Sequence, residues 1–66
     1  MKSYIVLYRD SMQEILPFAC QADDFDHAEE QTLNAFPDSE IVLVHQGNSV
    51  SFRGVKYTTT LKQSGI

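Results

Sequence analysis

One segment of the chain, residues 23–36, has the pattern of an amphipathic helix, and it stands alone between two β-rich stretches. Asp23 or Asp24 is suited to accept a hydrogen bond from an orphan amide at the helix start. Pro37 ends the segment, because the residue before a proline avoids helical angles. The apolar residues recur at steps of three and four and share one face of a helix about three turns long: Phe25, Ala28, Thr32 or Leu33, and Phe36.

The stretches on either side of this helix read as strands. Residues 2–9 are apolar on both alternating faces, which is typical of a central strand. Pro17 has no amide proton, so the strand at residues 14–21 is expected at a sheet edge or begins at that proline. Polar turns are expected at residues 10–13 and at 46–49, where Gly47 and Asn48 tolerate positive φ. Two further strands are predicted at residues 40–45 and 50–61.

The predicted fold class is therefore α+β, with the element order β-β-α-β-β. We expect the second and third strands to run parallel with the first between them, and the fourth to pair with the third through the Gly47-Asn48 turn. This gives one four-stranded, antiparallel-type sheet in the order 2-1-3-4, with the helix on one face. The other face is expected to stay open and apolar, and to be covered by a partner or by a second copy of the chain.

Length and composition place the chain among small globular domains. Its 66 residues form a single domain, 1–66, in which residues 62–66 are expected to be a frayed tail. A hydrophobic content of 42% argues against disorder. The single cysteine, Cys20, has no partner for an internal disulfide, which favours a reducing, cytoplasmic location. The apolar run at residues 5–7 is too short for a membrane span, so no membrane partner is expected.

The net charge of −4 is divided unevenly along the chain. All nine acidic residues lie in residues 1–40 with only two cations, whereas residues 41–66 carry three cations and no acid. Two electrostatically different surfaces are therefore expected. The acidic surface is predicted to bind a partner through the start of the helix: Asp23, Asp24, Asp26, Glu29 and Glu30.

No pattern in the sequence indicates catalysis or a bound cofactor. Asp23, His27 and Glu30 share a helix face, but a capped helix start with a solvated acidic face explains them better than a metal site. Cys20 alternates with Phe18 and reads as a small buried hydrophobe rather than a nucleophile. We therefore expect no enzyme activity, no cofactor, and neither a catalytic nor a metal-binding residue.

The residues 18–31, which include the run ADDFDHAEEQ at 22–31, and the residues NAFP at 34–37 resemble short uncharacterised ββαβ proteins encoded by bacteriophages and prophages. The resemblance also takes in the tyrosine-rich strand at residues 4–8 and the strand at residues 41–45, and so covers residues 1–46. It implies a phage origin and action in the cytoplasm of a bacterial host. It implies no activity and assigns no functional residue.

Three functions remain open from the sequence. The first is a non-enzymatic, phage-type accessory protein that binds a protein partner, such as a host enzyme or defence complex. The second is a nucleic-acid-binding module that mixes aromatic and basic side chains in the fourth strand and tail: Phe52, Arg53, Lys56, Tyr57 and Lys62. With so few cations, nucleic acid is the less favoured partner. The third is a small structural or assembly subunit that forms a homo-oligomer, with a homodimer as its simplest form.

Overall fold

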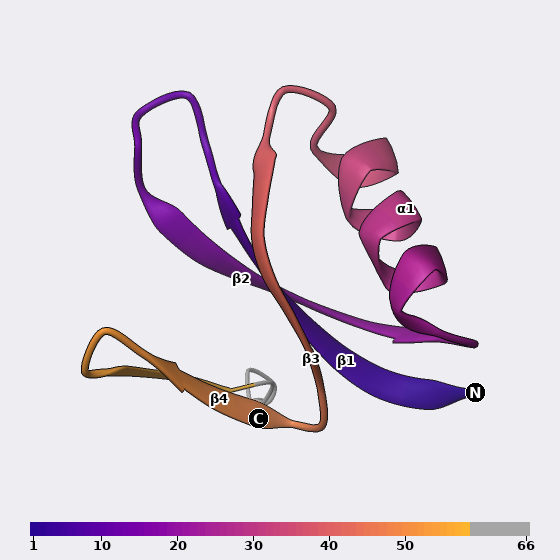
Figure 1. The fold of residues 1–66 in the computed structure, drawn as a ribbon. Helices are drawn as coiled ribbons and strands as arrows, with labels where there is room; N and C mark the ends of the chain where they lie inside the picture. The colour runs from indigo at the N-terminus through magenta and orange to yellow at the C-terminus, as the bar shows by residue number, and fades with distance from the viewer. Residues whose placement is uncertain (59–66) are drawn as a thin grey trace, which may run out of the picture.

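The computed structural model describes residues 1–58 of the chain as an α+β fold (Figure 1). In chain order the elements are β1 (Lys2–Arg9), β2 (Ile15–Ala22), α1 (Phe25–Ala35), β3 (Glu40–Gln46), β4 (Ser49–Phe52) and β5 (Val55–Thr58). Residues 59–66, which hold the end of the expected fourth strand, the expected frayed tail and Lys62, lie outside the described residues. Within residues 1–58, no helix has the length and apolar character needed to cross a membrane.

The strand β1 lies at the centre of a three-stranded sheet in the order β2-β1-β3. Both neighbours are antiparallel to it, so β2 and β3 run parallel to each other on either side, as predicted. Tyr4 is opposite Cys20 of β2 and Gln46 of β3. The register with β3 shifts after Leu7, where Val42 becomes an extra residue and forms a β-bulge.

The prediction of a single four-stranded sheet is wrong. The expected fourth strand is instead a separate two-stranded hairpin, β4-β5, with a turn at Arg53 and Gly54. These two residues have φ of 55° and 80°, and successive positive φ values are typical of the tight turns that close hairpins. Gly47 does not form the expected turn back along β3: its amide donates to the Ser3 carbonyl oxygen (2.8 Å), which continues the pairing with β1.

The helix α1 packs on the sheet face that carries Tyr4 and Val6. Ala28 and Thr32 point into this face and are fully buried, and the Thr32 hydroxyl donates to the Ala28 carbonyl oxygen (2.9 Å). The two small residues let the helix approach the strands closely, so Thr32 rather than Leu33 continues the predicted apolar stripe. Leu33 remains 40% exposed.

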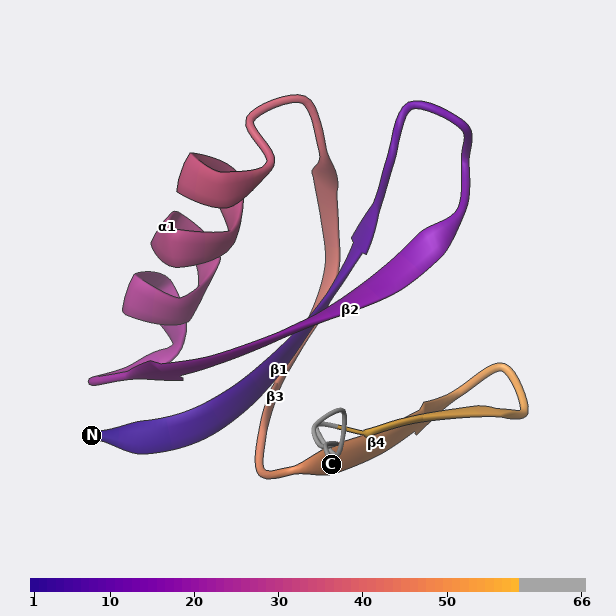
Figure 2. The same cartoon turned by 180° about the vertical axis from the view of Figure 1, so that it is seen from behind.

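The face of the sheet away from α1 is not open, contrary to the prediction. Ile5 and Leu7 point to this face and have 0% exposure within the single chain. In both views the β4-β5 hairpin lies on the side of the sheet away from α1 (Figures 1 and 2). The pairing of Val50 with Tyr57 gives the hairpin a half-buried apolar face. A second copy is therefore not needed to cover the centre of this face.

Burial of Leu7 predicts the cost of removing its side chain. We expect Leu7→Ala to lower the free energy of unfolding by about 2–5 kcal/mol, because it leaves a cavity at the centre of the sheet. Leu33→Ala, the same change at a partly exposed position, should cost about 1 kcal/mol or less. Urea unfolding followed by circular dichroism measures both. If Leu7→Ala does not fold, Ile5→Val should cost about 0.5–1.5 kcal/mol. Equal costs for the two leucines would contradict burial of this face.

Candidate functional site

The first turn of α1 is built around a capping aspartate. Asp24 has extended backbone angles (φ −158°, ψ −177°), and its carboxylate accepts a hydrogen bond from the His27 amide (2.8 Å). Its carbonyl oxygen accepts the Ala28 amide (3.1 Å), which begins the helical ladder. Of the two predicted caps, Asp24 is therefore the one used, and its side chain is committed to holding the helix start.

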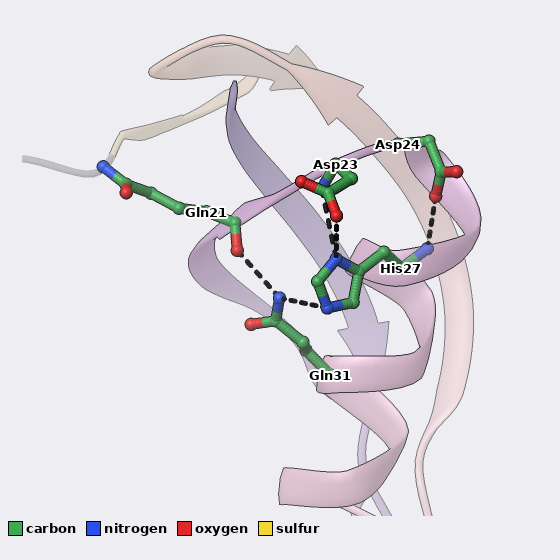
Figure 3. Close-up of polar contacts among 5 residues, drawn as sticks. All are labelled: Gln21, Asp23, Asp24, His27 and Gln31. Atoms are coloured by element: carbon green, nitrogen blue, oxygen red, sulfur yellow. Dashed lines mark hydrogen bonds and ion pairs between the residues drawn. The ribbon is translucent and has the colours of Figure 1, made fainter. Parts of the chain in front are cut away.

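His27 joins the helix start to the end of β2 (Figure 3). Its Nδ1 accepts the Asp23 amide proton at 3.1 Å and lies 3.9 Å from the Asp23 carboxylate. Gln31 Nε2 donates to the Gln21 carbonyl oxygen (2.7 Å) and lies 3.3 Å from His27 Nε2. The imidazole is therefore held between two backbone segments, and these contacts fix the connection between β2 and α1.

The five predicted partner-binding acids fall into two groups. Asp23 and Asp24 belong to the network that holds the helix start. Asp26 and Glu30 are exposed one helical turn apart, and Glu29 beside them is half-buried. Among residues 1–58, no cationic side chain forms an ion pair with these three carboxylates. We call Asp26, Glu29 and Glu30 the outer face of α1.

The β4-β5 hairpin brings together only some of the residues proposed for nucleic-acid binding: Phe52 and Tyr57 share one of its faces, whereas Lys56 lies on the other. The β4-β5 register places Phe52 opposite Val55, and Ser51 opposite Lys56, so Phe52 and Lys56 point to opposite faces of the hairpin. Phe52 and Tyr57 are half-buried, whereas a base-stacking platform needs exposed rings. The Arg53 guanidinium lies 5.5 Å from the centre of the Phe52 ring.

Cys20 is half-buried and packs against the core cluster around Tyr4 and Val6. Burial raises the pKa of its thiol, which disfavours the reactive thiolate. Cys20 also lines a shallow cavity of about 260 Å³ with Tyr4 and Asn48. Its position is that of a small hydrophobe, as its alternation with Phe18 indicates.

The larger cavity was not predicted. It has a volume of about 370 Å³ and lies between the β1-β2 turn and the connection from α1 to β3. Its floor is aromatic: the Tyr8 and Phe36 rings stack with centroids 4.5 Å apart and planes 16° apart, and Phe18 meets Phe36 edge-on at 5.7 Å. The lining residues are Tyr8, Asp10, Ser11, Leu16, Ala35, Phe36, Pro37, Asp38 and Ser39.

The walls of this larger cavity are acidic. Asp10 and Asp38 contribute carboxylates from different turns, and in the part of the chain that the structure describes no lysine or arginine lines the cavity. One oxygen of Asp10 accepts the Met12 and Glu14 amides (2.9 Å each) and so holds the β1-β2 turn. The adjacent Arg9 pairs with Glu40 at 3.0 Å. Burial raises the pKa of the Tyr8 phenol, and the negative charge of Asp10 raises it further.

Comparisons with known proteins assign no functional residue, either at the start of α1 or in the larger cavity. No protein-family model, curated protein or solved structure matches the chain. The described residues contain no group of three or more histidine, cysteine, aspartate or glutamate side chains that could hold a metal ion. The larger cavity is called the Tyr8–Phe36 cavity below, after its two stacked rings. This cavity and the outer face of α1 are therefore the features from which a function can be argued.

The Asp24 cap predicts a specific stability difference. Asp24→Ala should lower the free energy of unfolding by about 1 kcal/mol, because the His27 amide loses its acceptor. Asp24→Asn is the matched control: it removes the charge but keeps an oxygen acceptor, and should cost a few tenths of a kcal/mol at most. Urea unfolding measures both. Equal losses in the two variants would show that charge rather than capping matters at this position.

The raised pKa of Tyr8 predicts a loss of stability at alkaline pH. When the pKa of a phenol is higher in the folded chain than in the unfolded chain, the protonated phenol stabilises the fold. This stabilisation is complete below the unfolded pKa and is lost as the pH rises through the folded pKa. The free energy of unfolding should therefore fall above pH 10, the ordinary phenol pKa. Tyr8→Phe should fall less steeply, because it has no proton to lose there. Urea titrations at a series of alkaline pH values test this, and parallel curves would contradict it.

Proposed function

We propose that the chain is a non-enzymatic protein-binding module of the accessory type that bacteriophages encode. It binds a basic surface of a partner protein through the outer face of α1. One observation carries the proposal: Asp26 and Glu30 project from this face without a cationic partner among residues 1–58. They lie on a helix whose start is held rigidly by Asp24 and His27.

The charge distribution supports recognition by electrostatic complementarity. The chain has a net charge of −4. Its acidic residues all lie in residues 1–40, whereas Arg53 and Lys56 lie in the β4-β5 hairpin. Charges of this kind steer a partner of opposite sign and suppress like-charged competitors, and they act on the association rate more than on affinity. A rigid helix also loses little conformational entropy on binding.

The surroundings of the reactive side chains favour binding over catalysis. His27 is held by its contacts with Asp23 and Gln31, and the raised pKa of the Cys20 thiol keeps it in its unreactive form. The sequence resemblance to phage and prophage proteins points to the cytoplasm of a bacterial host as the place of action. A host protein with a basic surface is accordingly the partner we propose.

A tagged chain should capture a specific protein from a bacterial lysate, to be identified by mass spectrometry and then titrated in purified form. Glu30→Lys should weaken this binding about tenfold or more and slow association, because it places a cation against a basic surface. Asp26→Lys/Glu30→Lys should weaken it further. Both variants leave the Asp24 cap in place, so the helix start is retained.

Glu14→Lys is the matched control, since it makes the same charge change at an exposed position in the β1-β2 turn. It should bind nearly as well as the unmodified chain. Binding should also weaken as salt is added, because exposed charges are screened. Equal loss in Glu14→Lys and Glu30→Lys would contradict a role for the outer face of α1, as would binding that does not respond to salt.

A further inference from the structure

We infer that the Tyr8–Phe36 cavity is a binding site for an aliphatic organic cation, an alkylammonium or alkylguanidinium group on a short carbon chain. This chemistry is found in small amines and at the ends of lysine and arginine side chains. The site lies where the β1-β2 turn meets the end of α1. It is separate from the outer face of α1 and does not depend on the function proposed for that face.

The floor of the cavity suits the carbon chain of such a ligand. Phe36 stacks on Tyr8 and is nevertheless 39% exposed, so part of its ring is available to a ligand. Leu16 and Pro37 extend this apolar surface. An aromatic face attracts a cation as well as alkyl groups, because its quadrupole is negative above the ring.

Two aspartates in the walls of the cavity supply negative charge for the cationic end of the ligand. Asp10 and Asp38 reach the cavity from two different turns, and none of its lining residues within 1–58 is cationic. Asp10 uses one carboxylate oxygen for the amides of its turn, and its other oxygen has no hydrogen-bond partner among residues 1–58. Arg9, which precedes Asp10 in the chain, is paired with Glu40. A cationic ligand would supply the missing counter-charge.

Tyr8 provides an independent indication of a ligand. Its side chain lines the cavity and is only 5% exposed, yet its hydroxyl has no hydrogen-bond partner among the described residues. Buried polar groups are nearly always paired, so an unpaired phenol facing a cavity calls for a partner from outside the chain. An ammonium or guanidinium N–H can donate to this oxygen while the carboxylates balance its charge.

The size of the cavity limits the ligand. Its volume of about 370 Å³ is near the lower end of the range of about 300–1,000 Å³ typical of small-molecule sites. One aliphatic chain with a cationic end fits within such a volume, and the carboxylates of Asp10 and Asp38 disfavour the phosphate groups of a nucleotide. The site therefore has room for a small amine or for one basic side chain.

Nuclear magnetic resonance of the isotope-labelled chain, titrated with n-butylammonium and n-butylguanidinium, tests the inference. Saturable shifts are expected at the amides of Ser11, Asp38 and Ser39 and at the Tyr8 ring. Butyramide and butyrate, which keep the carbon chain without the positive charge, should give smaller shifts or none. A blocked lysine peptide separates the two sources: shifts equal to those of n-butylammonium indicate a protein side chain, and weaker shifts indicate a free amine.

Two variants and one control locate the site. Asp38→Asn should weaken n-butylammonium binding about two- to fivefold, as expected for an ion pair with an exposed carboxylate. Tyr8→Phe should weaken it about two- to tenfold, because only the hydroxyl acceptor is lost. Asp26→Asn, the same change on the outer face of α1, should have no effect. Shifts that do not saturate would overturn the inference, as would equal shifts with butyramide, unaltered binding in both variants, or tighter binding of Ca²⁺ at the same residues.

Discussion

Burial of β1 on both faces is the constraint on which the rest of the structure depends. Five consecutive residues from Tyr4 to Tyr8 are buried, and hydrogen-bonded neighbours flank the strand on both edges. Tyr4, Val6 and Tyr8 form the floor for α1, while Ile5 and Leu7 fill the other face. A chain this small buries only about 60% of its unfolded surface, so one strand that serves both faces is an economical way to build its core.

The elements with strong local signals could be predicted from the sequence, and their pairing could be predicted in part. The alternation in β1, the acid before the helix and Pro37 all act over a few residues, and the structure has the helix and first three strands where they indicate. The hairpin was missed because its turn uses Arg53 at φ 55°, a conformation that arginine seldom adopts, and the isolated Gly54 was the one local signal of a break in the expected strand. The sequence predicts a hairpin turn at Gly47, whereas in the structure its amide continues the pairing with β1.

The candidate sites show a different limit of sequence reasoning. An aspartate before a helix looks the same in sequence whether it caps the helix or faces a partner; the 2.8 Å contact with the His27 amide separates Asp24 from Asp26. The larger cavity was missed because its aromatic floor joins Tyr8, at the end of β1, to Phe36, at the end of α1. A signal was present, since each aromatic is followed within two residues by an aspartate. Only the fold shows that the two pairs meet.

The central position of β1 has a consequence for how the protein is made. A ribosome synthesises β1 before either of the strands that flank it, and Gln46, the partner of Tyr4 in β3, follows forty-two positions later. Until β3 leaves the exit tunnel, β1 can pair only with β2, and α1 has an incomplete surface to pack against. Such distant pairing forms slowly, because the entropy of closing the long loop is lost before the contacts are made. Once β1 has left the tunnel it therefore lacks one of its two flanking strands until β3 follows, a period in which chaperone contact would protect it.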